Sequence, residues 1–130
     1  MKVLFICAEN TCRSQIAEGL AKAADIDCES AGLKAGSGVN PKAIAVMEEL
    51  GIDISDQYSK SIDELENPEG FNLVVSLCHA DAKSVCPHVN IERKENWKID
   101  DPKGSNLDVY RRARDLIAMK LKKLKVVLEQ

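Results

Sequence analysis

A nucleophile and an anion donor stand close together near the start of the chain. Cys7 is followed by five residues, then by Arg13 and Ser14. If a strand ends at Cys7 and a helix follows at once, successive backbone N–H groups turn inward and make an anion nest at the positive helix end. The guanidinium of Arg13 adds a planar fork that suits two oxygens of a tetrahedral oxyanion. Ser14 can cap the helix and donate to the Cys7 sulfur, which favours the thiolate.

The segment therefore predicts an oxyanion-binding loop with a sulfur nucleophile behind the central atom of the anion. Glu9 is the unusual member, since a carboxylate directed inward would repel an oxyanion, and we expect it to point to solvent. The expected substrate-binding residues are Cys7, Ala8, Glu9, Asn10, Thr11, Cys12, Arg13 and Ser14.

A second pair of cysteines follows an apolar segment in the middle of the chain. Cys78 ends the segment 71–77, and Cys86 comes eight positions later. If the chain carries out redox chemistry at the oxyanion loop, it needs internal thiols as its electron source, because no flavin or nicotinamide motif is present. His79 and His88 beside this pair raise a minor alternative, a zinc-binding sensor module, although adjacent Cys-His ligands fit tetrahedral geometry poorly.

The elements that must position these residues alternate between strands and helices. Short apolar or extended segments predict strands at 3–6, 27–31, 71–77 and 89–91. Helical spacing of apolar residues and terminal signals predict helices at 14–24, 40–51 and 106–128. Such alternation predicts an α/β protein with a parallel sheet. Ligands bind beyond the carboxyl ends of such strands, where the loops after residues 6 and 77 both begin with a cysteine.

Composition sets the class of protein. The 130 residues suffice for one domain, residues 1–130, and the net charge of −3 with 4% aromatic residues disfavours nucleic acid as a partner. No apolar run approaches the length of a membrane span, and no secretory segment is visible. Five cysteines in such a chain indicate chemistry or metal binding rather than structural disulfides. We expect a soluble cytoplasmic protein that acts as a monomer, with no membrane partner.

Longer segments carry a family resemblance. The strand, the Cys-x5-Arg-Ser loop and the helix resemble the low-molecular-weight protein tyrosine phosphatase fold. Several segments are more similar to the thioredoxin-coupled arsenate reductases of that fold: residues 12–19, 30–32, 39–43, 51–55 and 97–102. The resemblance implies a three-layer α/β/α sandwich with a central, mainly parallel four-stranded sheet.

The resemblance also implies a reaction, the reduction of arsenate to arsenite by a relay of three cysteines. Cys7 would attack arsenate held by Arg13, and Asp101, which precedes Pro102, would protonate the leaving oxygen. Cys78 and Cys86 would form the final disulfide. External thioredoxin would reduce it, and no cofactor would be bound.

The resemblance assigns loop-supporting positions as well, namely Asn10, Ser14, Glu18, Ser30 and Lys60. Glu18 and Ser30 match positions that help to form a potassium site in some relatives, where a carboxylate would match Lys60. We expect the Lys60 ammonium to replace the cation, so that K⁺ is not required.

The main alternative is a phosphatase that hydrolyses aryl phosphates through a Cys7 phosphoenzyme. Phosphatases of this fold tend to have aromatic residues after the Asp-Pro pair, whereas Lys103-Gly104-Ser105 follows here. This departure favours the reductase.

Overall fold

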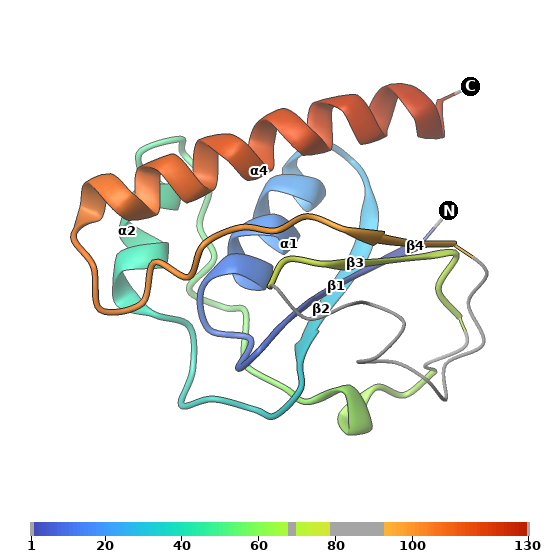
Figure 1. The fold of residues 1–130 in the computed structure, drawn as a ribbon, viewed down its shortest axis with the longest axis horizontal. Coiled ribbons are helices and arrows are strands. Elements are labelled where there is room, and N and C mark those ends of the chain that lie inside the picture. The colour runs from blue at the N-terminus through green and yellow to red at the C-terminus, as the bar shows by residue number, and fades with distance from the viewer. Residues whose placement is uncertain (1, 68–69, 79–92, 130) are drawn as a thin grey trace.

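The computed structural model describes residues 2–67, 70–78 and 93–129, and strands and helices alternate along them (Figure 1). The elements in chain order are β1 (Lys2–Cys7), α1 (Arg13–Ala23), β2 (Asp27–Gly32), α2 (Pro41–Glu48), the 3₁₀ turn η1 (Ile62–Glu64), β3 (Leu73–Ser76), β4 (Arg93–Asn96) and α4 (Leu107–Leu128). No helix in these ranges is long and apolar enough to cross a membrane.

The four strands form one parallel sheet in the order β2-β1-β3-β4. β1 lies between β2 and β3, and Ile6 pairs with Ala31 on one side and Ser76 on the other. The inner strands are buried along almost their whole length, which explains their continuous apolar sequences. The predicted α/β fold with a parallel four-stranded sheet is confirmed.

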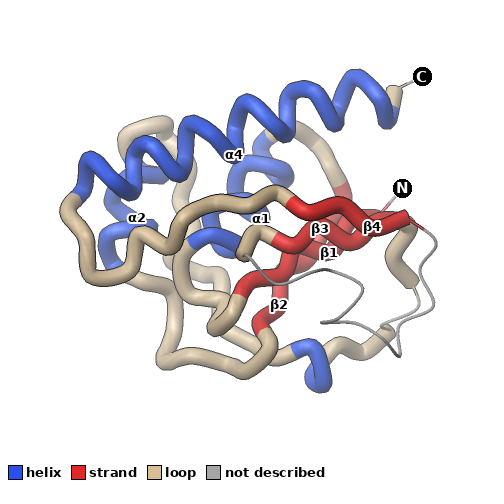
Figure 2. Tube along the Cα trace, in the orientation of Figure 1, coloured by secondary structure: helices blue, strands red, loops and turns tan. Residues whose placement is uncertain are grey.

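The two faces of the sheet are covered differently. Side chains of α1, α2 and α4 pack with Val3 and Phe5 in the larger core, and Figures 1 and 2 show these helices together on one side of the strands. Trp97 joins this core, with its ring 6.1 Å from that of Phe5. Leu4 and Ile6 point to the opposite face, which η1 and the residues around it cover in the described part of the chain.

Most predicted boundaries hold within one or two residues. Asn40 caps α2 and Asn106 caps α4, each through a side-chain oxygen that accepts a backbone N–H of the first turn. The first helix differs from the prediction, because α1 begins at Arg13 with Cys12 as its N-cap residue. Ser14 therefore does not cap it.

One strand was missed. β4 comprises Arg93–Asn96 and was not predicted, whereas the strand expected at 89–91 lies outside the described residues and stays a prediction. Its four polar residues lack the apolar pattern of a buried strand, because β4 is at the edge of the sheet and is partly exposed.

Candidate active site

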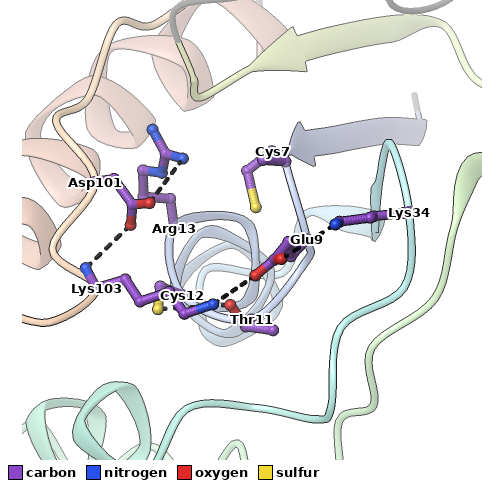
Figure 3. A pocket seen from close by; sticks show the side chains of 9 residues that line it. Cys7, Glu9, Thr11, Cys12, Arg13, Lys34, Asp101 and Lys103 are labelled. Atoms are coloured by element: carbon purple, nitrogen blue, oxygen red, sulfur yellow. Dashed lines mark hydrogen bonds and ion pairs between the residues drawn. The ribbon is translucent and has the colours of Figure 1, made fainter.

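A cavity of about 330 Å³ opens at the carboxyl end of β1 (Figure 3). Loops that follow β1, β2 and β4 enclose it, as expected for a parallel sheet. Among the described residues it is lined by Cys7, Ala8, Glu9, Thr11, Cys12, Arg13, Lys34, Asp101 and Lys103, none of which is aromatic. The structure thus places most of the predicted loop and Asp101 around one cavity, and adds Lys34 and Lys103, which sequence reasoning did not assign to the site.

Asn10 holds the loop in shape from behind. Its φ of 58° is in the left-handed region, which asparagine tolerates better than most residues. The fully buried side chain donates to the hydroxyls of Ser14 (2.7 Å) and Ser30 (2.9 Å) and accepts the backbone N–H of Lys60 (3.0 Å). Gln15 donates to the Asn10 carbonyl (2.9 Å). The loop is therefore tied to α1, β2 and the segment before η1.

Cys7 lies at the floor of the cavity with its sulfur 2.8 Å from the Ser14 hydroxyl oxygen. Because Asn10 already donates to that oxygen, the hydroxyl proton of Ser14 is free to point at the sulfur. The backbone N–H groups of residues 8–12 donate no backbone hydrogen bond within the described part of the chain. Together with the amino end of α1 they make a positive environment that favours binding of an anion.

Arg13 is held rigidly beside the loop. Its side chain is almost fully buried, and Nη1 donates to the carbonyls of Ile99 (2.8 Å) and Leu77 (3.5 Å). Nη2 lies 3.7 Å from Asp101. The Nε atom is buried and has no hydrogen-bond partner among the described residues. A buried charged donor without an acceptor is costly, so this atom calls for an acceptor such as an oxyanion oxygen.

Asp101 reaches the cavity from the loop after β4, where it is half exposed. Its Oδ1 accepts the backbone N–H of Lys103 (3.0 Å), and its other oxygen faces Arg13. A partly solvated carboxyl on the wall of the cavity is placed to exchange a proton with a bound group.

The sequence predicts that Glu9 points to solvent, but the structure meets this prediction only in part. Glu9 lines the cavity with about a third of its side chain exposed, and Lys103 Nζ (2.6 Å) and Lys34 Nζ (3.7 Å) contact its carboxylate. The hydrogen bond from Lys103 lowers the pKa of Glu9, and the same contact raises the pKa of Lys103. Two ammonium groups thus offset the carboxylate that would otherwise oppose an anion.

Cys78 follows β3, the strand next to β1 on the side opposite β2, so it leaves the same edge of the sheet as Cys7. It is a buried free thiol whose sulfur is 3.5 Å from the Ser76 hydroxyl, and it does not line the cavity. Cys86, His79 and His88 lie outside the described residues, so the second cysteine of the pair and the zinc alternative stay predictions. In the described ranges no group of three or more His, Cys, Asp or Glu residues could hold a metal ion.

We expected the ammonium group of Lys60 to take the place of a cation beside Glu18 and Ser30, and the structure shows a different arrangement. Glu18 accepts the Ser30 hydroxyl (2.5 Å), but the ammonium group on Glu18 belongs to Lys22, at 2.6 Å. Lys60 is buried, with its Nζ 4.9 Å from the centre of the Tyr58 ring. Glu18, Lys22 and Lys60 line the same pocket. Sequence reasoning missed Lys22, although its spacing of four residues from Glu18 on a helix is a readable signal.

The two other described cysteines are poor nucleophiles. Burial raises the pKa of Cys12, whose sulfur is 3.6 Å from the Tyr110 hydroxyl oxygen. Burial also raises the pKa of Cys28, to about 12. Both therefore stay as thiols at neutral pH, in keeping with packing roles.

In this parallel sheet an inner strand ends in a cysteine, and the loop that follows has the geometry to bind an oxyanion. These features define the class of cysteine-dependent, phosphatase-like α/β proteins. The comparisons specify the family: the model of the low molecular weight phosphotyrosine protein phosphatase family matches residues 2–130, and the chain belongs to this family.

Its relatives include both reductases and phosphatases. The chain is 42% identical over 126 residues to the glutaredoxin arsenate reductase of Synechocystis sp., and 45% identical over 129 residues to an arsenate reductase of Staphylococcus aureus, with 95% of each chain covered in both cases. A solved arsenate reductase in the phosphate-binding state is similar with a TM-score of 0.81 and 41% identity, covering 95% of both chains. The YwlE arginine phosphatase from Geobacillus stearothermophilus superposes with a TM-score of 0.86 at 26% identity, covering 98% of this chain and 92% of its own.

Proposed function

We propose that this chain, acting as one domain over residues 1–130, reduces arsenate to arsenite with electrons from its own thiols. The observation that carries the proposal is Cys78, a free thiol just beyond the strand next to the one that delivers Cys7. A hydrolase with Cys7, Arg13 and Asp101 would be complete without it. The names of the relatives at 42–45% identity support the same activity.

The oxyanion loop would bind arsenate through the N–H groups of residues 8–12 and the guanidinium of Arg13. The unpartnered Nε of Arg13 supports this role. The Cys7 thiolate would then attack arsenic while Asp101 protonates the departing oxygen, so that water leaves and a Cys7–arsenic(V) adduct forms. The fixed position of Arg13 lowers the cost of ordering this complex.

Electrons would move in the next step. The thiolate of Cys78 attacks the Cys7 sulfur, and the sulfur–arsenic bond breaks with its electron pair staying on arsenic. Arsenic(V) becomes arsenic(III), arsenite leaves, and Cys7 and Cys78 are joined in a disulfide. Cys86 then attacks Cys78, which frees Cys7 and leaves a Cys78–Cys86 disulfide.

An external dithiol protein must reduce that disulfide, and we propose thioredoxin in the cytoplasm, where thiols are kept reduced. The name of the Synechocystis relative makes glutaredoxin the second candidate. We propose no bound cofactor and a monomer. The ammonium group of Lys22 on Glu18, with Lys60 lining the same pocket, supports independence from K⁺. Arsenate turnover at equal ionic strength in KCl and NaCl tests this, and a severalfold faster rate in KCl would contradict it.

The second candidate function is hydrolysis of phosphate monoesters through a Cys7 phosphoenzyme. The family model and the structural likeness to an arginine phosphatase support it. Residual phosphatase activity does not separate the two, because the loop would accept phosphate in either case.

Arsenite formed per NADPH consumed is the decisive measurement. The purified chain is supplied with arsenate, NADPH and either thioredoxin with its reductase or glutaredoxin with glutathione and its reductase. We expect equimolar arsenite and NADP⁺ in the thioredoxin arm, and loss of turnover in Cys78→Ser and Cys86→Ser. Cys28→Ser is the matched control, since this thiol lies on β2 away from the cavity. Full activity of either relay variant would refute the relay, and turnover only with glutaredoxin would change the reductant.

A further inference from the structure

One partly exposed ion pair joins two residues that line the cavity from different loops. Glu9 Oε2 lies 2.6 Å from Lys103 Nζ, and the two residues are 94 positions apart in the chain (Figure 3). Glu9 belongs to the oxyanion loop, and Lys103 belongs to the loop after β4 that carries Asp101. We call the contact between Glu9 and Lys103 the rim bridge. Lys34, from the loop after β2, supports its carboxylate end at 3.7 Å.

Both ends of the rim bridge are fixed by other contacts. The Glu9 carbonyl accepts the Ser59 hydroxyl (2.8 Å) and the Gly36 N–H (2.9 Å). At the other end, the backbone N–H of Lys103 donates to Asp101, and Lys42 Nζ donates to the Ser105 carbonyl (2.6 Å). The bridge therefore joins two anchored loops and is more than a chance contact of long side chains.

Its position makes it sensitive to the size of the ligand. The cavity of about 330 Å³ is near the small end of the usual range of ligand pockets, and the described residues that line it offer no aromatic or large aliphatic surface. An unsubstituted tetrahedral oxyanion can sit on the loop beneath the bridge. A phosphate monoester must carry its organic group out through the mouth, where this group competes with the contact between Glu9 and Lys103.

We propose that the rim bridge is a specificity-determining element that favours unsubstituted inorganic oxyanions over phosphate monoesters. The proposal rests on the oxyanion pocket of the proposed function, but not on the cysteine relay. A monoester must break the ion pair to make room for its organic group, so its binding free energy is reduced by the free energy of that pair. An inorganic oxyanion binds without breaking the pair. The charges of Glu9, Lys34 and Lys103 act equally on two ligands that are both dianions, so their effect cancels in a ratio of affinities.

Isothermal titration of the full chain tests the proposal. The probes are inorganic phosphate and phenylphosphonate, which keeps an organic group and cannot be hydrolysed, both at about pH 8. The quantity of interest is the ratio of the phenylphosphonate Kd to the phosphate Kd. In Glu9→Gln and in Lys103→Met we expect this ratio to fall about two- to fivefold, the range for a partly exposed ion pair.

The control variant is Glu29→Gln, which removes the same charge from a comparably exposed pair with Lys2 (3.0 Å) outside the cavity. Its ratio should match that of the unmodified chain. Raising the salt from about 0.05 M to about 0.5 M should lower the ratio in the unmodified chain, because salt screens the bridge, and should leave it unchanged in Glu9→Gln. This second measurement does not depend on how well a variant folds.

An equal ratio in the bridge variants and the control, or a salt-independent ratio in the unmodified chain, would overturn the proposal while the oxyanion pocket stands. If the ratio falls as expected but no arsenite is produced with any reductant, the bridge stands and the reductase fails. If phosphate does not bind to the unmodified chain, both proposals are wrong.

Discussion

Replacement of Asn10 by alanine tests whether the oxyanion loop owes its shape to this one buried side chain. Asn10→Ala removes three hydrogen bonds, to the Ser14 and Ser30 hydroxyls and from the Lys60 N–H. It also leaves a residue with a Cβ and no polar group at a φ of 58°. The perturbation therefore has a hydrogen-bonding part and a backbone part, and the two can be measured separately.

The magnitude follows from typical values for each part. Three net hydrogen bonds at about 1 kcal/mol each contribute about 3 kcal/mol. The left-handed backbone costs alanine about 1 kcal/mol more than asparagine or glycine. The total is about 4 kcal/mol, a large part of the roughly 5–15 kcal/mol that stabilises a domain. At a urea slope of about 2 kcal/mol/M, the midpoint of unfolding should fall by about 2 M.

Urea denaturation of the unmodified chain, Asn10→Ala and Asn10→Gly measures both parts. Glycine accepts the φ value but makes none of the side-chain bonds, so we expect it to lose about 3 kcal/mol and to be about 1 kcal/mol more stable than alanine. Phosphate affinity should weaken about tenfold or more in both variants, because the N–H groups of the loop lose their alignment. A loss below about 1 kcal/mol in Asn10→Ala, or unchanged phosphate affinity in Asn10→Gly, would refute this account of the loop.

Three further predictions concern separate features of the molecule. Arg13→Lys should weaken phosphate binding about 30-fold or more, measured by titration calorimetry, since lysine cannot keep both the carbonyl of Ile99 and an oxyanion; an affinity within threefold of the unmodified value would contradict it. Gly32→Ala should lower stability in urea by about 1–3 kcal/mol, because a Cβ there would stand 2.6–2.8 Å from backbone atoms of two neighbouring loops; wild-type stability would show that these loops yield freely. Hydrogen bonds from Arg111 and Arg114 lower the pKa of Glu49 to about 2 from an ordinary 4.5. The stability that this carboxylate contributes is thus complete above about pH 4.5 and is lost as the pH falls through about 2. The Tm difference between the unmodified chain and Glu49→Gln should therefore be largest near neutral pH and vanish near pH 2, and a pH-independent difference would count against the ion pairs.

The features that were predictable from the sequence are those encoded over short distances. Cys7, Arg13 and Ser14 are close in the chain, so their order alone predicts the loop and its nucleophile. The apolar segments at 3–6 and 71–77 predict buried parallel strands because both faces of those strands are covered. By contrast, β4 carries no apolar signal, since an edge strand needs none.

Charges that meet only after folding were out of reach. Glu9 was expected to face solvent because its repulsion of an oxyanion could be read from the sequence, while its neutralisation by Lys34 and Lys103 could not. Those lysines belong to loops after other strands, and nothing local pairs them with Glu9. The capping role of Ser14 was wrong for a smaller reason: Ser14 has the residue type of a cap, but its hydroxyl is used by Asn10 and Cys7.

Trp97 gives the chain a built-in optical probe. It is the single tryptophan of the sequence, its indole is buried against Phe5, and its backbone N–H donates to the Ser76 carbonyl (2.7 Å), while the Ser76 hydroxyl touches the Cys78 sulfur. Indole emission is quenched by nearby disulfides and shifts with local polarity. Stopped-flow fluorescence could therefore time the oxidation and reduction of Cys78 in the unlabelled molecule, without dyes or added chromophores.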